Sequence, residues 1–327
     1  MRLPNRWMSR SFAVVGFTVL LYGAAAAITG WGEFRAGLAD VPLALAAPLV
    51  GLSLMNYLLR FGRWQLLLGR LGVVLPAAWS ARLYFSTFLM VITPGKIGEA
   101  FKAGVMHEQR GVPLGLGLPA VVAERIYDLL GVLLIAAAGL LLWPGPLGGV
   151  TTALVAAASV PIGLALLRSR RVREQLVARA SRAPFLRDRR PALGEALEAL
   201  SQLLAPGPAL AALMLSTVAW AAECFSLWLL CRALGLPVGP GEAFFIYAAA
   251  TLVGSLSFLP GGLGGTEAVI VALLSSLGVT VAEGLTVALV VRLVTLWLAV
   301  VLGAAVFLAS RGLWTDRAQA RTSARRS

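Results

Sequence analysis

The sequence predicts an all-α polytopic membrane protein, and two properties of its composition support this fold class. Of the 327 residues, 59% are hydrophobic and only 13% are charged, whereas soluble domains are typically about 45–50% apolar and about 25% charged. Several apolar runs also reach about 20 residues, the length that an α-helix needs to cross about 30 Å of hydrocarbon. We therefore expect a single integral membrane domain over residues 1–327.

About six full transmembrane helices are predicted from the long apolar runs. They cover residues 12–30, 43–62, 118–142, 148–167, 208–231 and 281–309. The first run is interpreted as an uncleaved span, because it is long and the following WGEFRAGLAD contains no convincing signal-peptide cleavage site. Two shorter apolar stretches, 77–93 and 242–259, each run into a Pro-Gly break. Simple hydropathy would count these as spans too and give eight helices.

Arginine-rich segments orient the predicted helices, because positive charge is concentrated on the cytoplasmic side of membrane proteins. Such segments lie at residues 2–10, 60–70, 168–190 and 311–326. We therefore expect a bacterial inner-membrane protein with cytoplasmic N- and C-termini, in which Arg60 and Arg63 mark the inner end of the second span. The same distribution explains the formal net charge of +13 without a nucleic-acid partner.

This orientation predicts that two segments enter the membrane and return to the side from which they came. Residues 77–117 begin and end inside, whereas residues 242–277 begin and end outside. Each is interpreted as a re-entrant hairpin, whose irregular backbone a membrane tolerates only within protein or beside a wet cavity. The predicted tips are Pro94, Gly95 and Gly98 in the first hairpin and Pro260, Gly261 and Gly264 in the second.

An internal repeat relates the two hairpins. PGKIGE at 94–99 is echoed by PGGLGGTE at 260–267, and downstream a Gly-Val pair is followed by one arginine, Arg125 or Arg292. The two copies are inverted, because their hairpins enter from opposite sides. Inverted repeats with broken helices are typical of transporters whose site lies near the midplane. Duplication retained only for packing is the alternative.

The repeats divide the chain into four parts. Repeat one covers about residues 43–143 and repeat two about 208–310. Between them a basic cytoplasmic loop, about 168–206, either anchors the topology or lies on the anionic lipid surface of the cytoplasmic face. A cytoplasmic tail follows at 311–327.

Six ionisable residues around the hairpins are the predicted substrate-binding residues, since hydrocarbon penalises such groups by about 2.5–3.5 kcal/mol each. They are Lys96, Glu99, Lys102, Arg125, Glu267 and Arg292. In the functional interpretation the basic members bind a phosphate, which suits the bidentate fork of arginine. In the alternative, all six form inert ion pairs. We expect Arg292 to pair with Glu267 or Glu223, and Arg125 with Glu99.

A half-helix that follows each tip is expected to direct unpaired N–H groups at the cavity between the hairpins, which also favours an anion. Three acids, Glu99, Glu223 and Glu267, are possible proton carriers for such a transporter.

No cofactor and no metal site are predicted. Cys224 and Cys231 are seven residues apart on one predicted helix, about 10 Å along its axis, which is too far for a disulfide. The sequence shows no metal-ligand cluster, no nucleophile with a paired base and no Walker A loop. We therefore expect a protein that is not an enzyme.

The motifs PGKIGEAFKAG…ERIYDLLG and LPGGLGGTEAVIVALLSSLGV…VVRL resemble the membrane domain of bacterial lysylphosphatidylglycerol synthases, the multiple peptide resistance factor family. The resemblance covers about residues 45–310. It implies a flippase that moves a lipid across the membrane, and it leaves other phospholipids, polyprenyl-linked sugars and hopanoids open as substrates. The basic residues around the hairpins favour a polar, phosphate-bearing head group. Lysyl-lipid synthesis is not expected, because the chain has no room for the soluble aminoacyl-transfer domain.

Two other functions stay open from the sequence. The first is an integral-membrane transferase acting on a lipid carrier, with Glu99 or Asp128 as base. The second is a non-transporting membrane scaffold for a glycosyltransferase. The expected partner is a membrane lipid substrate, and a homo-oligomer or a separate glycosyltransferase or synthase partner is compatible with either reading.

Overall fold

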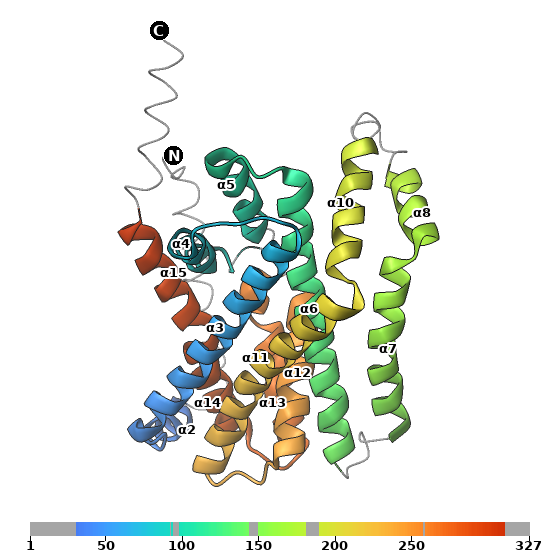
Figure 1. Ribbon diagram of the computed structural model, residues 1–327. Coiled ribbons are helices and arrows are strands. Elements are labelled where there is room, and N and C mark those ends of the chain that lie inside the picture. The colour runs from blue at the N-terminus through green and yellow to red at the C-terminus, as the bar shows by residue number, and fades with distance from the viewer. Residues whose placement is uncertain are drawn as a thin grey trace.

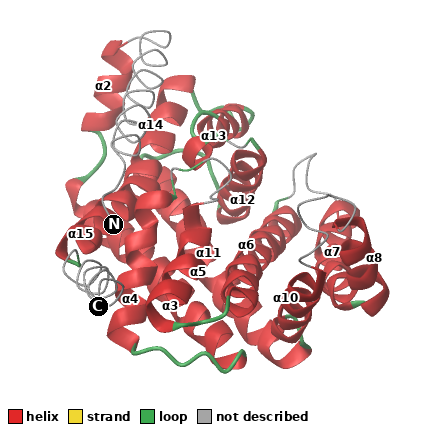
Figure 2. Ribbon diagram, turned by 90° about the horizontal axis from the view of Figure 1, so that it is seen from above, coloured by secondary structure: helices red, strands yellow, loops and turns green. Residues whose placement is uncertain are grey.

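The computed structural model describes residues 31–91, 93, 98–143, 150–180, 190–257 and 259–310. Within these ranges the secondary structure is helical and contains no strand (Figures 1 and 2). The predicted all-α polytopic membrane fold is therefore confirmed. The predicted first span at 12–30 and the tail at 311–327 lie outside the described residues.

Within the described residues, four helices are long and apolar enough to cross a membrane (Figure 1). They are Leu43–Arg70, which comprises η1 (Leu43–Leu45) and α3 (Ala46–Arg70), then α6 (Leu114–Leu142), α11 (Pro206–Ala233), and Val281–Ala309, which joins α14 (Val281–Arg292), the π-helical η5 (Leu293–Trp297) and α15 (Leu298–Ala309). Each has 28 or 29 residues and is therefore about 42–44 Å long. They correspond to four of the six predicted spans.

For two of the predicted spans, the observed helix bounds differ from the predicted ones. Residues 148–167 correspond to α7 (Val150–Arg168). The second span does not end at residue 62, because α3 continues without a break to Arg70. The sequence RFGRWQLLLGR contains no proline, and its apolar residues continue the helical periodicity. Arg60 and Arg63 therefore lie within the span, and not at its end as predicted.

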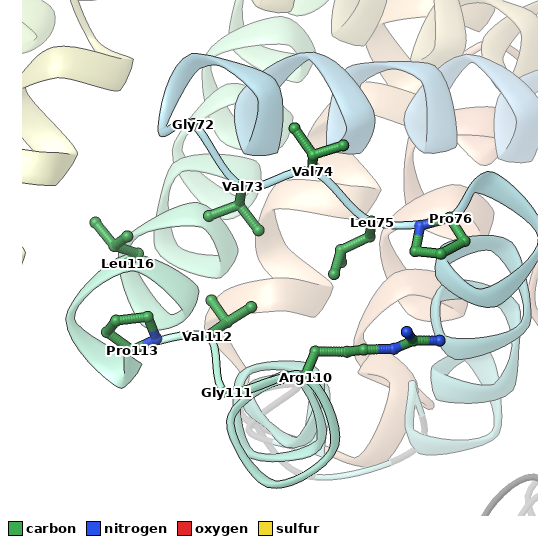
Figure 3. A pocket seen from close by; sticks show the side chains of 10 residues that line it. All are labelled: Gly72, Val73, Val74, Leu75, Pro76, Arg110, Gly111, Val112, Pro113 and Leu116. Carbon is green, nitrogen blue, oxygen red and sulfur yellow. The ribbon is translucent and has the colours of Figure 1, made fainter.

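The first hairpin begins and ends at one end of the bundle. It contains α4 (Ala77–Ser86), η2 (Thr87–Met90) and α5 (Phe101–Arg110). Figure 3 shows residues 72–76, which precede α4, lining one pocket together with Arg110, the last residue of α5, and residues 111–113, which follow it. The Arg110 guanidinium also lies 4.9 Å from the ring centroid of Trp79. The helices of this segment are too short to cross a bilayer, so the chain enters the bundle and returns.

The second hairpin has the same form at the other end. It contains α12 (Pro240–Leu256), η4 (Pro260–Gly262) and α13 (Gly265–Ser275). Phe245, early in α12, and Leu277, just after α13, pack on the same pair of side chains at the end of α6, Leu140 and Trp143. Both ends of this hairpin therefore lie at one end of the bundle.

The two hairpins enter from opposite ends because α6 connects those ends. Leu116, in its first turn, lines the pocket at the base of the first hairpin, and Leu140 packs on the base of the second. The 29 residues of α6 separate the two bases by about 40 Å. This is the arrangement expected of inverted repeats, whose boundaries stay a prediction.

A further group of helices covers one flank of α6. Figure 2 shows α7, α8 (Arg170–Ala180) and α10 (Arg190–Leu203) side by side next to α6. The Tyr127 hydroxyl donates a hydrogen bond to the Leu203 carbonyl at 2.9 Å, and Ala199 and Leu203 are buried. Within the predicted basic cytoplasmic loop, about 168–206, the described residues thus form α8 and α10, and α10 packs against α6. On another side, α2 (Trp31–Ala39) packs against α14.

Candidate functional site

Residues from both hairpins line a cavity of about 350 Å³. The first hairpin contributes Val91 and Thr93, and the second contributes Gly261 and Gly262 at its turn. Its lining from α6, residues 125–132, lies near the middle of that helix, so the cavity is near mid-depth of the bundle. Its charged lining residues are Arg60, Arg125, Asp128, Glu223 and Arg292.

Arg125 connects the middle of α6 to the first hairpin. Its Nη2 lies 3.0 Å from Glu99 Oε2 and 2.8 Å from Asp128 Oδ2. The predicted pairing of Arg125 with Glu99 is therefore present. Gly98, a predicted tip residue, precedes Glu99 and donates its N–H to Thr93 Oγ1 at 3.0 Å. This bond brings the returning chain against the entering one. Pro94, Gly95 and Lys96 lie outside the described residues.

Asp128 accepts contacts from three arginines and one tryptophan. Arg63 Nη1 lies 2.7 Å from Oδ1, and Arg60 Nη2 lies 3.2 Å from Oδ2. Trp220 Nε1 donates to Oδ1 at 3.0 Å. With Arg125, these groups bring α3, α6 and α11 together around one carboxylate.

Arg60 and Arg63 were predicted to mark the cytoplasmic end of a span, and this was wrong. Their side chains are 10% and 0% exposed, respectively. The sequence contains a signal for this placement. Ser53, Asn56, Arg60 and Arg63 are separated by three or four residues, so they share one helix face. A polar stripe along an apolar helix is typical of a face that lines a buried polar site.

Lys102 belongs to the same ion-pair cluster but not to the cavity lining. Its Nζ hydrogen-bonds to Glu124 and lies 3.8 Å from Glu99 Oε2. It also lies 4.6 Å from the ring centroid of Trp64 and 4.8 Å from that of Tyr84. The Lys102 side chain is 2% exposed, so it is buried among these partners. It is not among the residues that line the cavity. We call Arg60, Arg63, Glu99, Lys102, Glu124, Arg125 and Asp128 the Asp128 cluster.

Arg292 connects α14 to the tip of the second hairpin. Its Nε lies 2.8 Å from Glu267 Oε1, and its Nη2 donates to the Gly261 carbonyl. Of the two expected partners of Arg292, the ion pair is thus with Glu267. Arg125–Glu99 and Arg292–Glu267 are equivalent in the two repeats, because each joins the arginine of the span to the glutamate of the tip motif.

The turn of the second hairpin depends on glycine. Gly261, Gly262 and Gly264 have φ of 61°, 68° and 84°, a region that other residues enter only with strain. Pro260 begins the short 3-10 turn before them. The Gly264 N–H donates to Glu267 Oε2 at 2.7 Å. The Glu267 side chain therefore caps the start of α13 by accepting the N–H of the residue before it.

Glu223 is the other buried acid of the cavity. It lies on α11, is 2% exposed, and accepts a hydrogen bond from Ser53 Oγ at 3.5 Å. Among the described residues no basic nitrogen lies within 4.0 Å of it, so it forms no ion pair there. Its position in the sequence, in the middle of an apolar run, indicated a buried acid.

Some buried polar atoms of the residues that line the cavity are unsatisfied. Arg60 Nε, Arg125 Nε and Thr295 Oγ1 have no hydrogen-bond partner among the described residues. Unsatisfied guanidinium donors of this kind suit an anion with several oxygen atoms. Other polar lining residues, among them Tyr57, Trp220 and Tyr247, could not be identified from the sequence, because these residue types occur throughout apolar helices.

The described residues contain no group of three His, Cys, Asp or Glu side chains that could hold a metal ion. Cys224 and Cys231 are buried free thiols, as predicted from their spacing.

Comparison with known proteins agrees with this architecture. The chain is 28% identical over 259 residues to a UPF0104 membrane protein of Methanothermobacter thermautotrophicus, an alignment that covers 72% of this chain and 76% of the relative. The sequence model of the lysylphosphatidylglycerol synthase TM region matches residues 11–303. Because this match includes both hairpins, the cavity and most of the chain, the protein belongs to the lysylphosphatidylglycerol synthase TM region family.

Proposed function

We propose that this protein is a lipid transporter, a flippase that moves a polar-headed, phosphate-bearing lipid across the inner membrane without a covalent step. The observation that carries the proposal is the cavity near mid-depth, lined by Arg60, Arg125 and Arg292, between hairpins that enter from opposite ends. A site between inverted, discontinuous elements is the arrangement that alternating access requires.

The chemistry of the cavity supports a phosphate-bearing head group. Arg125 and Arg292 are held by Glu99 and Glu267, which keep both guanidinium groups oriented when no substrate is bound. A phosphate can accept from the remaining N–H donors, and such charge-assisted bonds are about twice as strong as neutral ones.

The apolar lining of the cavity favours a lipid over a free solute as the substrate. Leu129, Leu256 and Leu259 line the cavity and yet are 53%, 73% and 41% exposed on the outer surface. The wall between α6 and the second hairpin therefore has an apolar outer face. A head group can occupy the cavity while its acyl chains lie against these leucines in the bilayer.

The predicted orientation forms part of the proposal. The arginine-rich segments favour cytoplasmic N- and C-termini, so the first hairpin would enter from the cytoplasmic side. The second would then enter from outside.

The test is lipid movement in proteoliposomes with two fluorescent probes, phosphatidylglycerol and a hexosylceramide, which has a polar head group without phosphate. A membrane-impermeant quencher reports the leaflet of each probe. We expect protein-dependent movement of the phosphate-bearing probe and much slower movement of the hexosylceramide. Arg292→Lys keeps the charge beside Glu267 but removes the fork, and should slow the phosphate-bearing probe by about tenfold, the equivalent of one charged hydrogen bond.

The matched control is Arg232→Lys, because Arg232 is an exposed residue in the last turn of α11 and does not line the cavity. It should move lipid at the wild-type rate. Equal rates in vesicles with and without the protein would contradict the proposed function.

A further inference from the structure

Glu223 is the buried acid whose role the proposed function leaves open. The other acids of the site, Glu99, Glu124, Asp128 and Glu267, each lie within 4.0 Å of a basic nitrogen. Glu223 has one hydrogen bond, from Ser53 at 3.5 Å, and lines the cavity. Burying an ionised carboxylate without a counterion costs free energy. Such a group is therefore expected to bind a proton when its negative charge no longer compensates a nearby positive charge.

The charge count of the site gives Glu223 a specific role. The Asp128 cluster has four basic and three acidic groups, so its net charge is 4 − 3 = +1. The Arg292–Glu267 pair is neutral, 1 − 1 = 0. An ionised Glu223 contributes −1 and makes the described buried site neutral. Glu223 is therefore the acid that balances the excess positive charge of the cluster from across the cavity.

An anionic head group would compete with Glu223 for this positive charge. A phosphodiester bears one negative charge, so its entry beside an ionised Glu223 would leave the site at −1. Excess charge in a medium of low dielectric is unfavourable. If Glu223 takes up one proton, the site with its ligand is neutral again.

Charged and titratable groups face Glu223 from every neighbouring helix. Among the described residues, none of these groups is a second acid in contact with Glu223, which is consistent with this role. They are Tyr57 and Arg60 of α3, Asp128 of α6 across the cavity, Cys224 of α11 itself, Tyr247 of α12 and Arg292 of α14. Two of them, Arg60 and Arg292, are arginines that line the same cavity, and their positive charge favours the ionised carboxylate when the cavity is empty.

We propose that Glu223 is a proton-binding site coupled to the substrate, which takes up one proton when one phosphodiester anion enters the cavity and releases it when the anion leaves. This inference rests on the proposed function and adds that the protein cotransports a proton with the lipid. Coupling of this kind is reciprocal, so a bound proton strengthens anion binding by the same factor as the anion strengthens proton binding.

The test uses the purified full-length protein in detergent and dihexanoyl phosphatidylglycerol, a soluble phosphodiester, as probe. Calorimetric titration in two buffers of different ionisation enthalpy counts the protons taken up on binding. We expect about one proton per anion at pH values where free Glu223 is ionised. The affinity should fall about tenfold per pH unit as the pH rises through that range, and should be independent of pH below it.

Glu223→Gln removes the titratable group and keeps its size, so binding of the probe should be accompanied by no proton uptake and its affinity should not depend on pH. Glu223→Asp should retain the uptake. Glu242→Gln, a half-buried glutamate in the first turn of α12 and outside the cavity lining, should behave as the wild type. Gel filtration and tryptophan fluorescence confirm that each variant is folded.

The outcomes separate this inference from the proposed function. Probe binding without proton uptake in the wild type, or with unchanged uptake in Glu223→Gln, would overturn the inference and leave lipid transport standing. Absence of probe binding, together with absence of lipid movement in proteoliposomes, would overturn both.

Discussion

Asp128 is the central carboxylate of the buried ion-pair cluster in this protein. Its two oxygens accept contacts from Arg60, Arg63 and Arg125. Removing each arginine from water costs desolvation free energy, which only a nearby negative charge offsets. The sequence indicated Arg125 and its neighbour Asp128, which are three residues apart. It could not indicate that two arginines of α3 converge on the same carboxylate, because that contact depends on how α3 packs against α6.

Replacement of this carboxylate by an amide should be strongly destabilising. Asp128→Asn leaves three arginines around a neutral group, and the loss of one partner from a buried ion pair typically costs about 3–5 kcal/mol. We expect a large decrease in the apparent thermal unfolding temperature, measured by tryptophan fluorescence in detergent. Glu108→Gln is the matched control, because Glu108 is an exposed residue on α5, and it should unfold near the wild-type temperature. Wild-type stability of Asp128→Asn would show that the cluster does not require this charge.

At the scale of secondary-structure elements, the last long helix and the first hairpin pack backbone against backbone. A Cβ atom at Gly303 of α15 would lie 2.4 Å from the Leu89 backbone nitrogen in η2 and 2.9 Å from the Phe88 carbonyl carbon. The nearest atoms belong to the backbone, so no side-chain rotation can make room. The hairpin of the first half is thus held by a helix of the second half. The apolar run at 281–309 predicted this helix, but its partner is more than 200 residues away in the chain.

This close approach predicts that substitution by alanine affects stability differently at two glycines of long helices. Gly303→Ala should destabilise the protein by about 1–3 kcal/mol through overpacking, seen as a lower apparent thermal unfolding temperature. Gly62→Ala, in α3, meets no atom within 4 Å and should leave stability unchanged or raise it, since alanine favours helix by about 1 kcal/mol over glycine. Equal effects of the two substitutions would argue against the packing of α15 on the first hairpin.

For the whole molecule, the two hairpins enter the bundle from opposite ends. Three features support this arrangement: the helix lengths, the pocket at the base of the first hairpin and the hydrophobic cluster at the base of the second, where residues from both sides of each hairpin meet. In the proposed transport cycle, the two halves would expose this one cavity in turn to either end of the bundle.

Labelling of single cysteines on the two surfaces of the membrane tests this topology. The test uses a chain with Cys224 and Cys231 replaced by alanine. Val74→Cys precedes the first hairpin, Glu108→Cys lies near the end of α5, the last helix of that hairpin, and Ser276→Cys follows α13 of the second hairpin; all three positions are exposed. A membrane-impermeant maleimide should label positions 74 and 108 from the same side and position 276 from the opposite side. Labelling of 74 and 108 from opposite sides would mean that the first hairpin crosses the membrane.

The sequence by itself determined the class of this protein, because spans of 20 or more apolar residues admit few structures other than membrane helices. It also predicted the two hairpins, through arginine distribution and Pro-Gly breaks, and the pairing of Arg125 with Glu99, while it left Glu267 and Glu223 as alternative partners of Arg292. Only the tertiary structure decided that Arg60 and Arg63 are buried, that Lys102 stays away from the cavity, and that Glu223 faces it. Those outcomes depend on which helix faces meet, and the pattern of one chain does not encode the rotation of each helix about its axis.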